Sequence, residues 1–177
     1  MKLTRYEAQN AATLIEAIPF KTSTATLPGR TMAAIAIANA TLQQTNTETQ
    51  TIVSDIATKL KTEDFDQRYA KRDKAIKEAF PEGTPFDPEK WNQICPDPEF
   101  EKIVEDADAE FNRATDEACT VPIDIPLHLS ADHLADISAL IITTDTVNLH
   151  DTPIPTPQFI RAIAPLFTLQ TPAQQPC

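Results

Sequence analysis

Glycine is almost absent from this chain, because Gly29 and Gly83 are the only two among 177 residues. Phosphate-binding loops and nucleophile elbows need two or three glycines at close spacing, where the backbone approaches a phosphate or turns with positive φ. The patterns GxGxxG, GxSxG and GxxxxGK followed by Ser or Thr are therefore excluded, and classical nucleotide-binding folds become poor candidates. With fifteen prolines in the chain, this composition predicts helices joined by proline-containing connections.

A capping box opens the first predicted helix, since Thr4 is followed three residues later by Glu7. Apolar residues then recur at steps of three and four, namely Ala8, Ala11, Leu14, Ile15 and Ile18. Pro19 ends this helix because it lacks an N–H donor and clashes with the preceding turn.

A longer helical pattern follows over residues 30–60, with apolar positions close to a heptad stripe. Threonines at 45–51 lower the helix propensity, so we expect a soft or locally broken middle. The pattern resumes over residues 65–80 and ends at Pro81. The sequence leaves open whether Thr62 caps a separate helix or lies within one continuous rod.

Five prolines between residues 81 and 98 indicate a loop or tether, with room for one turn of helix over residues 87–94. Asp97 is then a good N-cap, with Pro98 at the first helical position. Apolar side chains follow at helical spacing, namely Phe100, Ile103, Val104, Ala107, Phe111, Ala114 and Ala118. This pattern predicts a helix that ends near Ala118.

Charge is distributed unevenly between these two helical segments. Residues 97–118 hold nine acidic and two basic side chains, which is −7 of the net charge of −11, whereas residues 59–78 hold seven basic and five acidic ones. An antiparallel pair would set a basic-leaning helix beside an acidic one, with an apolar seam between them. Charge and apolar pattern therefore predict a helical hairpin in which Phe111 is buried, so that its truncation would cost about 3–5 kcal/mol, and Glu105 is exposed.

After Cys119 the apolar spacing changes from helical to alternating, through Val121, Ile123, Ile125, Leu127 and Leu129. This alternation predicts an edge strand in which Pro122 and Pro126 turn their nitrogens away from the partner. The predicted partner is residues 139–143 or 146–149, and helix and strand are nearly tied across residues 138–145.

Two short helices are predicted in the C-terminal third. Ser130 caps the first, which runs through Leu134 and Ile137, and Thr156 caps the second, with Pro157 at its first position. The predicted fold class is therefore mainly α (α+β), a long helical hairpin with a small C-terminal β-containing cap. We expect one domain over residues 1–169, with a helical part at 1–118, a cap at 119–169 and a disordered tail at 170–177.

Three cysteines, Cys95, Cys119 and Cys177, are far apart and form no CxxC pair, which disfavours a disulfide framework or a zinc ribbon. The only cluster of metal-ligand types is His128, Asp132, His133, Asp136, His150 and Asp151. Its spacing matches no standard zinc motif, so solvent-facing turn residues are the simpler interpretation. No residue is assigned as catalytic, cofactor-binding or metal-binding, and no cofactor is expected.

The longest nearly unbroken apolar run is seven residues, at 32–38, against the roughly 20 needed to span a bilayer. The N-terminus turns polar at once and offers no apolar region for a secretory signal. We therefore expect a cytoplasmic protein that does not contact membranes. Its acidity also argues against direct binding of nucleic acid.

The order of features resembles a family of small, uncharacterised proteins encoded by tailed phages and prophages. The segments that carry the resemblance are Lys2-Leu3-Thr4, Leu27-Pro28, Phe100, Phe111 through Val121-Pro122-Ile123-Asp124-Ile125 and Leu127, and Thr156-Pro157-Gln158-Phe159-Ile160 to Leu166-Phe167. The chain departs from that family in its alanine- and threonine-rich central helix, its proline-rich tether and its longer end. The resemblance transfers no functional residue and implies only a viral accessory or assembly context.

The leading hypothesis is a non-enzymatic interaction or assembly protein that acts through helical contacts with a partner protein or with itself. One alternative is an acidic inhibitor that mimics nucleic acid and binds a basic host protein. The other is a hydrolase or metal-binding protein that uses the His/Asp cluster at residues 128–151. No small-molecule ligand is evident from the sequence.

Overall fold

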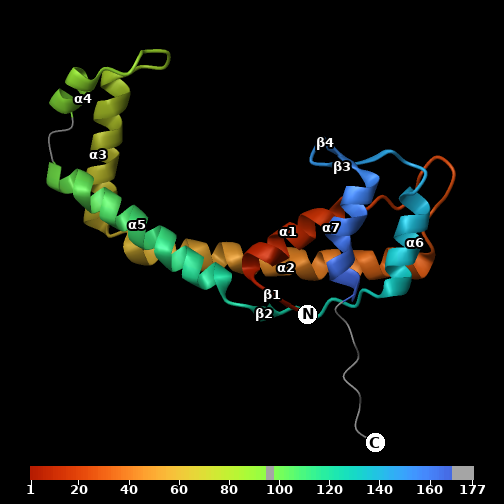
Figure 1. The fold of residues 1–177 in the computed structure, drawn as a ribbon. Coiled ribbons are helices and arrows are strands. Elements are labelled where there is room, and N and C mark those ends of the chain that lie inside the picture. The colour runs from red at the N-terminus through yellow and green to blue at the C-terminus, as the bar shows by residue number, and fades with distance from the viewer. Residues whose placement is uncertain (95–97, 169–177) are drawn as a thin grey trace, which may run out of the picture. The chain divides into compact units, whose positions relative to one another are not determined.

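The fold is mainly helical, as predicted, in a computed structural model that describes residues 1–94 and 98–168 (Figure 1). These residues contain seven helices and four short strands. Asp97, the predicted N-cap, and residues 170–177, the predicted tail, lie outside the described part of the chain. Within that part, no helix combines the length and the hydropathy that a membrane-spanning segment requires.

The chain divides into two compact units. Unit 1 consists of Met1–Gln50 and Cys119–Cys177, and unit 2 is Thr51–Ala118. This division differs from the predicted one, which placed all of residues 1–118 in one helical part. The physical reason is that the first 50 residues share a hydrophobic core with the C-terminal segments.

Helix α1 (Arg5–Glu16) confirms the first predicted helix. Its capping box is formed, because Glu7 N donates to Thr4 Oγ1 at 3.1 Å and Thr4 N donates to Glu7 Oε2 at 2.7 Å. Ala8, Ala11 and Ile15 are buried. The helix therefore presents the predicted apolar stripe to the core.

Helix α2 (Gly29–Leu60) is one continuous element of 32 residues. The predicted soft middle is wrong. Four threonine hydroxyls each donate to the carbonyl four residues earlier: Thr41 to Ile37, Thr45 to Thr41, Thr47 to Gln43 and Thr49 to Thr45, at 2.8–3.0 Å. The hydroxyls are thus satisfied inside the helix and do not compete for backbone groups elsewhere.

Helices α6 (Ala131–Ile141) and α7 (Thr156–Thr168) complete unit 1, where both pack in the core with α1 and the first half of α2. Ser130 caps α6 as predicted, and α6 extends to Ile141, which settles the tie in this region in favour of helix up to that residue. Thr156 does not precede its helix as predicted but is its first residue, and its hydroxyl donates to Thr144 O at 2.6 Å. That bond anchors the start of α7 to the preceding loop.

Two small antiparallel sheets lie in unit 1. Strand β1 (Lys2–Leu3) pairs with β2 (Ile123–Asp124), and β3 (Thr146–Leu149) pairs with β4 (Thr152–Pro155). Both predicted partners of the edge strand are therefore wrong, since residues 139–141 belong to α6 and Thr146–Leu149 pairs within its own hairpin. The strand β2 is short because Pro122 and Pro126 lie on either side of its ladder and cannot donate.

The alternation beyond β2 nevertheless determines which side chains are buried. Ile125, Leu127 and Leu129 are at most 2% exposed, whereas Pro126 and His128 are exposed. The segment therefore lines the core of unit 1 as an extended chain, although the ladder assigned to β2 covers only Ile123 and Asp124.

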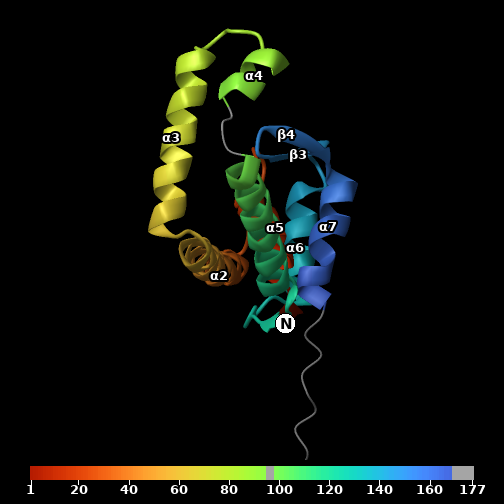
Figure 2. The same ribbon diagram turned by 90° about the vertical axis from the view of Figure 1, so that its left-hand side faces the viewer.

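Unit 2 contains the end of α2 together with α3 (Glu63–Ala79), α4 (Pro88–Ile94) and most of α5 (Pro98–Thr120). Thr62 caps a separate helix, because its hydroxyl accepts from Phe65 N at 3.2 Å. Figures 1 and 2 show α3 leaving the end of α2 in a new direction and α5 returning past both. The predicted helical hairpin is therefore confirmed, with α4 at its turn.

Burial distinguishes the two units sharply. All twenty buried residues of the hydrophobic core cluster belong to unit 1. In the part of unit 2 whose side chains are described, Val104, at 9% exposure, is the only buried hydrophobic residue. Phe111 lies on the predicted stripe but is only partly buried, so the expected cost of 3–5 kcal/mol for its truncation is too large for a single chain.

Candidate functional site

The predicted His/Asp cluster is dispersed over three separate structural roles. His133 Nδ1 accepts from Ser130 N at 3.2 Å and so completes the capping box of α6. Asp136 Oδ2 accepts from Thr31 Oγ1 at 2.5 Å and lies 3.5 Å from Arg30 Nη2. That carboxylate joins α6 to the start of α2.

His150 and Asp151 form the two-residue turn between β3 and β4. Their φ angles are 46° and 63°, as a type I′ hairpin turn requires at both central positions. His128 and Asp132 are exposed. Across the described residues, no three His, Cys, Asp or Glu side chains are arranged to hold a metal ion.

Of the three cysteines, Cys119 alone lies within the described residues. It carries a free thiol and is 1% exposed, as expected for a small apolar core residue. Cys95 and Cys177 lie outside the described part of the chain.

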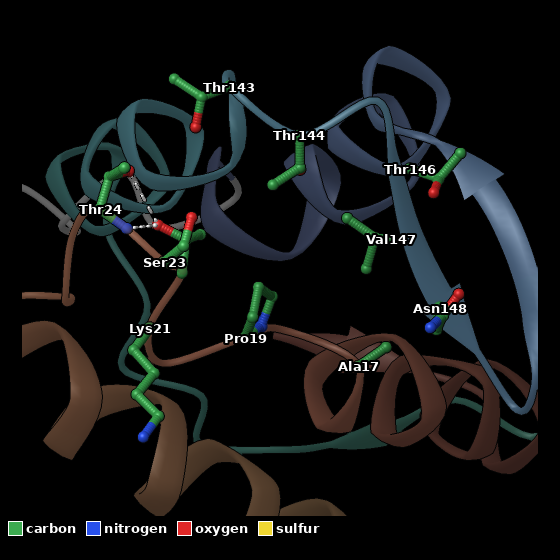
Figure 3. Close-up of a pocket in the computed structure, with 11 residues that line it drawn as sticks. Ala17, Pro19, Lys21, Ser23, Thr24, Thr143, Thr144, Thr146, Val147 and Asn148 are labelled. Atoms are coloured by element: carbon green, nitrogen blue, oxygen red, sulfur yellow. Dashed lines mark hydrogen bonds between the residues drawn. The ribbon is translucent and has the colours of Figure 1, made fainter.

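A cavity of about 500 Å³ lies in unit 1, between the loop that follows α1 and the loop that follows α6 (Figure 3). Its lining is rich in hydroxyl groups and consists of Ala17, Pro19, Lys21, Thr22, Ser23, Thr24, Thr143, Thr144, Thr146, Val147 and Asn148. Lys21 is the single ionisable side chain of this lining, and in Figure 3 it points away from the other residues.

Several of these hydroxyls are already engaged in local structure. Thr22 Oγ1 accepts from Ala25 N at 3.2 Å, and Thr144 Oγ1 donates to Ile141 O at 2.7 Å. Acid–base catalysis needs a group whose pKa is placed near the working pH. The residues that line this cavity include no carboxylate, imidazole or thiol. Its surroundings are those of a hollow at the protein surface between two loops.

A second feature, in unit 2, consists of two adjoining cavities of about 160 and 320 Å³ along α3 and α5. Lys61, Phe65 and Asp108 line both cavities. We call the combined feature the α3–α5 groove. Its full lining is Ala57, Leu60, Lys61, Phe65, Asp66, Tyr69, Arg72, Val104, Ala107, Asp108 and Phe111.

The groove has an apolar floor between charged walls. Val104 is buried and Phe65 and Phe111 are partly buried, while Phe65 stacks on Tyr69 with ring centroids 6.0 Å apart. Arg72 closes one end, where its Nη2 donates to Glu101 Oε2 at 2.9 Å. A lining of this kind, with aromatic residues, an arginine and a polar rim, is typical of protein-binding surfaces.

An aromatic cluster continues from the groove to the turn of the hairpin. Phe86 lies 5.8 Å from both Phe80 and Trp91, as measured between ring centroids, and is 66% exposed. Arg72 stacks over Trp91 at 5.5 Å, and Lys90 lies 5.4 Å from the centre of Phe80. These cation–π contacts fix the orientation of the turn relative to α3.

The acidic charge of α5 is partly neutralised near its C-terminal end. Arg113 donates to Glu110 and to Glu117, each at 2.5 Å. The hydrogen bond and the charge of Glu110, followed by those of Glu117, raise the pKa of Arg113, and the same bond lowers the pKa of Glu110. The acidic surface that would resemble nucleic acid is thereby reduced to the middle of the helix.

Sequence reasoning identified the apolar stripe of α5 but missed that its partner leaves the stripe open. A signal was present, because ten of the 17 residues of α3 are charged. Such a helix carries too little apolar area to close a core.

Comparison with known proteins adds no assignment for either feature. No protein-family model, curated protein or solved structure matches the chain.

Proposed function

We propose that this protein is a non-enzymatic interaction module, and that the α3–α5 groove is the surface through which it binds other protein chains. The observation that carries this proposal is the open apolar floor of the groove, where Phe65 and Phe111 stay partly exposed beside the buried Val104. Amphipathic helices bind grooves of this type by inserting apolar side chains at helical spacing.

Charge on the walls supports the same proposal. Lys61, Asp66, Arg72 and Asp108 surround the apolar floor, so that both signs are present within one surface. Mixed charges around an apolar centre set the register and the choice of partner more than the affinity. A solvated helix would need no such arrangement around partly exposed aromatic rings.

Photo-crosslinking from the groove tests this function. A photoreactive phenylalanine derivative replaces Tyr69, which lines the groove and is 45% exposed. The matched control replaces Tyr6 of α1, which is 41% exposed in unit 1. Irradiation of cells that produce each variant should give crosslinked protein chains from position 69 in excess over position 6. Equal or absent crosslinking at the two positions would overturn the proposal.

The acidic-inhibitor alternative is supported by Glu105, Asp106 and Asp108, which form no ion pair within the described residues. It predicts crosslinks from α5 to basic nucleic-acid-binding proteins. A phage or prophage origin rests on the sequence resemblance and stays a prediction, as does a cytoplasmic location.

A further inference from the structure

The described side chains of unit 2 bury little apolar surface for a helical unit of its size. In its described side chains Val104 is the one buried hydrophobic residue, while Leu60, Phe65 and Phe111 are partly exposed along the groove. Association is one of the ways in which small helical units without a sufficient core gain stability. A second protein surface over the groove would bury these side chains, and the charges on the rim indicate which surface fits.

Within the described residues, the two charged side chains that line both cavities have no ion-pair partner. Lys61 and Asp108 both line the two cavities of the groove, and neither forms an ion pair within the described residues. By contrast, Lys74 and Lys77 of α3 pair with Glu78 and Asp73. The part of the rim that both cavities share thus offers one unpaired cation and one unpaired anion. Asp66, which lines only the larger cavity, adds a second carboxylate that forms no ion pair among the described residues.

A surface that carries one cation and one anion is complementary to itself under a twofold rotation. Each charge then meets the opposite charge of the second copy, so the pair forms twice in one interface. The wider charge distribution agrees, since residues 59–78 hold a net charge of +2 and residues 97–118 hold −7. Placing the basic segment of one copy beside the acidic segment of the other separates the two acidic helices.

We propose that a second copy of this chain covers the α3–α5 groove about a twofold axis, with Lys61 of each copy paired to Asp108 of the other. This inference rests on the proposed function and names the partner of the same surface. The paired grooves bury Leu60, Phe65 and Phe111 in a core made by two copies, which gives unit 2 the apolar interior that one copy lacks.

Reciprocal charge reversal tests the pairing. Light scattering after size-exclusion chromatography at tens of micromolar should show a dimer for the native sequence. Lys61→Glu and Asp108→Lys each place two like-charge pairs in the interface, and each should raise the dimer dissociation constant by about tenfold or more. The controls Lys59→Glu and Glu105→Lys change the charge equally at exposed positions that do not line the groove, and they should leave the dimer intact.

Mixing the two reversed variants isolates the contact between copies. In a heterodimer of Lys61→Glu with Asp108→Lys, every pair is opposite in charge, so the mixture should dimerise more tightly than either variant alone. The double variant Lys61→Glu/Asp108→Lys should also dimerise, which shows that neither change prevents folding. A monomeric native protein, or a mixture that stays monomeric, would overturn the pairing.

These outcomes are separable from those of the proposed function. A monomeric purified protein whose position 69 still crosslinks to another protein species would leave the proposed function in place and remove the self-association. A dimer whose position 69 crosslinks to a second copy supports both. Absence of crosslinks from position 69 together with a monomer would remove both.

Discussion

Unit 1 and unit 2 both carry apolar side chains at helical spacing, yet among the described side chains only those of unit 1 close a core. In unit 1 the stripes of α1, α2, α6 and α7 and the extended segment after β2 converge, and twenty side chains are buried together. In unit 2 the charged helix α3 faces α5 and leaves an open groove. An apolar stripe on one helix therefore does not make a core by itself, because apolar stripes from several elements must pack together.

Polar residues have different roles in the two units. In unit 1, polar groups close the ends of elements, as Ser130 and His133 do for α6 and Thr156 does for α7. In unit 2, charged groups lie beside the apolar floor, as Lys61 and Asp108 do in the groove. The first use stabilises one chain, and the second favours a partner.

The largest contrast should come from truncating one phenylalanine in each unit. Phe159 is 0% exposed in the core of unit 1, so Phe159→Ala should cost about 3–5 kcal/mol through the lost burial and the cavity left behind. Phe111 is partly exposed, so Phe111→Ala in dilute protein should cost roughly half as much.

Urea unfolding with two probes measures this contrast. Trp91 is the only tryptophan and lies in unit 2, so its fluorescence follows that unit, whereas far-UV circular dichroism follows the helices of both. Phe159→Ala should shift the main dichroism transition with a smaller shift at Trp91, and Phe111→Ala should do the reverse. Identical shifts in both probes would mean that the units unfold together and that the comparison must be abandoned.

A buried hydroxyl gives the next largest effect, in unit 1 alone. Thr31 is 0% exposed and donates to the Asp136 carboxylate. Thr31→Val keeps the shape but removes the donor, which should cost about 1.5–3 kcal/mol because the bond involves a charged group. Thr41→Val is the matched control, since the Thr41 hydroxyl donates only to Ile37 O on its own helix.

Urea melts followed by circular dichroism compare the two threonine variants. Thr31→Val should lower the midpoint of unit 1 and leave the Trp91 transition in place, whereas Thr41→Val should change either by about 0.5 kcal/mol or less. Equal effects of the two substitutions would show that the link between α2 and α6 contributes nothing specific.

The sequence predicted the interactions between residues that are close along the chain and missed those between distant segments. The predicted caps at Thr4 and Ser130 depend on neighbours three residues away, and both are formed. The sequence left the role of Thr62 open, and it caps α3. The pairing of Lys2 with Asp124 joins the two chain segments of unit 1, which are far apart in the sequence, and two residues of strand are too few to show alternation. The groove was missed for the same reason, since its openness depends on contacts between helices that no periodicity describes.

Each unit has a turn residue with positive φ, and substitutions at the two positions should change stability in opposite directions. Asp151 has a φ of 63° in unit 1, and Gly83 has a φ of 85° in unit 2. Asp151→Gly should stabilise unit 1 by about 0.5–1 kcal/mol, and Gly83→Ala should destabilise unit 2 by a similar amount, because only glycine adopts this conformation without strain. A Cβ at Gly83 would meet nothing within 4 Å, so strain is the only source of that effect.

Thermal unfolding followed by circular dichroism and by Trp91 fluorescence measures the effect of each turn substitution separately. Asp151→Gly should raise the dichroism midpoint of unit 1, and Gly83→Ala should lower the Trp91 midpoint. A stabilising Gly83→Ala would indicate that the loop before α4 has no fixed conformation, and the contrast between two ordered units would then weaken.

The smallest expected effect concerns pH and the cap of α1. Hydrogen bonds from the backbone and the side chain of Thr4 lower the pKa of Glu7 in the folded protein. A lowered pKa means that the ionised form of Glu7 stabilises the folded state. This contribution to stability is complete above the unfolded pKa of about 4.3 and is lost as pH falls through the folded value.

Glu7→Gln removes the charge, and the difference in unit 1 stability between native protein and variant should therefore shrink as pH falls below about 4. The Trp91 transition should show no such pH-dependent difference between the two proteins, because Glu7 lies in unit 1. A difference that persists unchanged at low pH would assign the effect of Glu7 to packing and not to its ionised carboxylate.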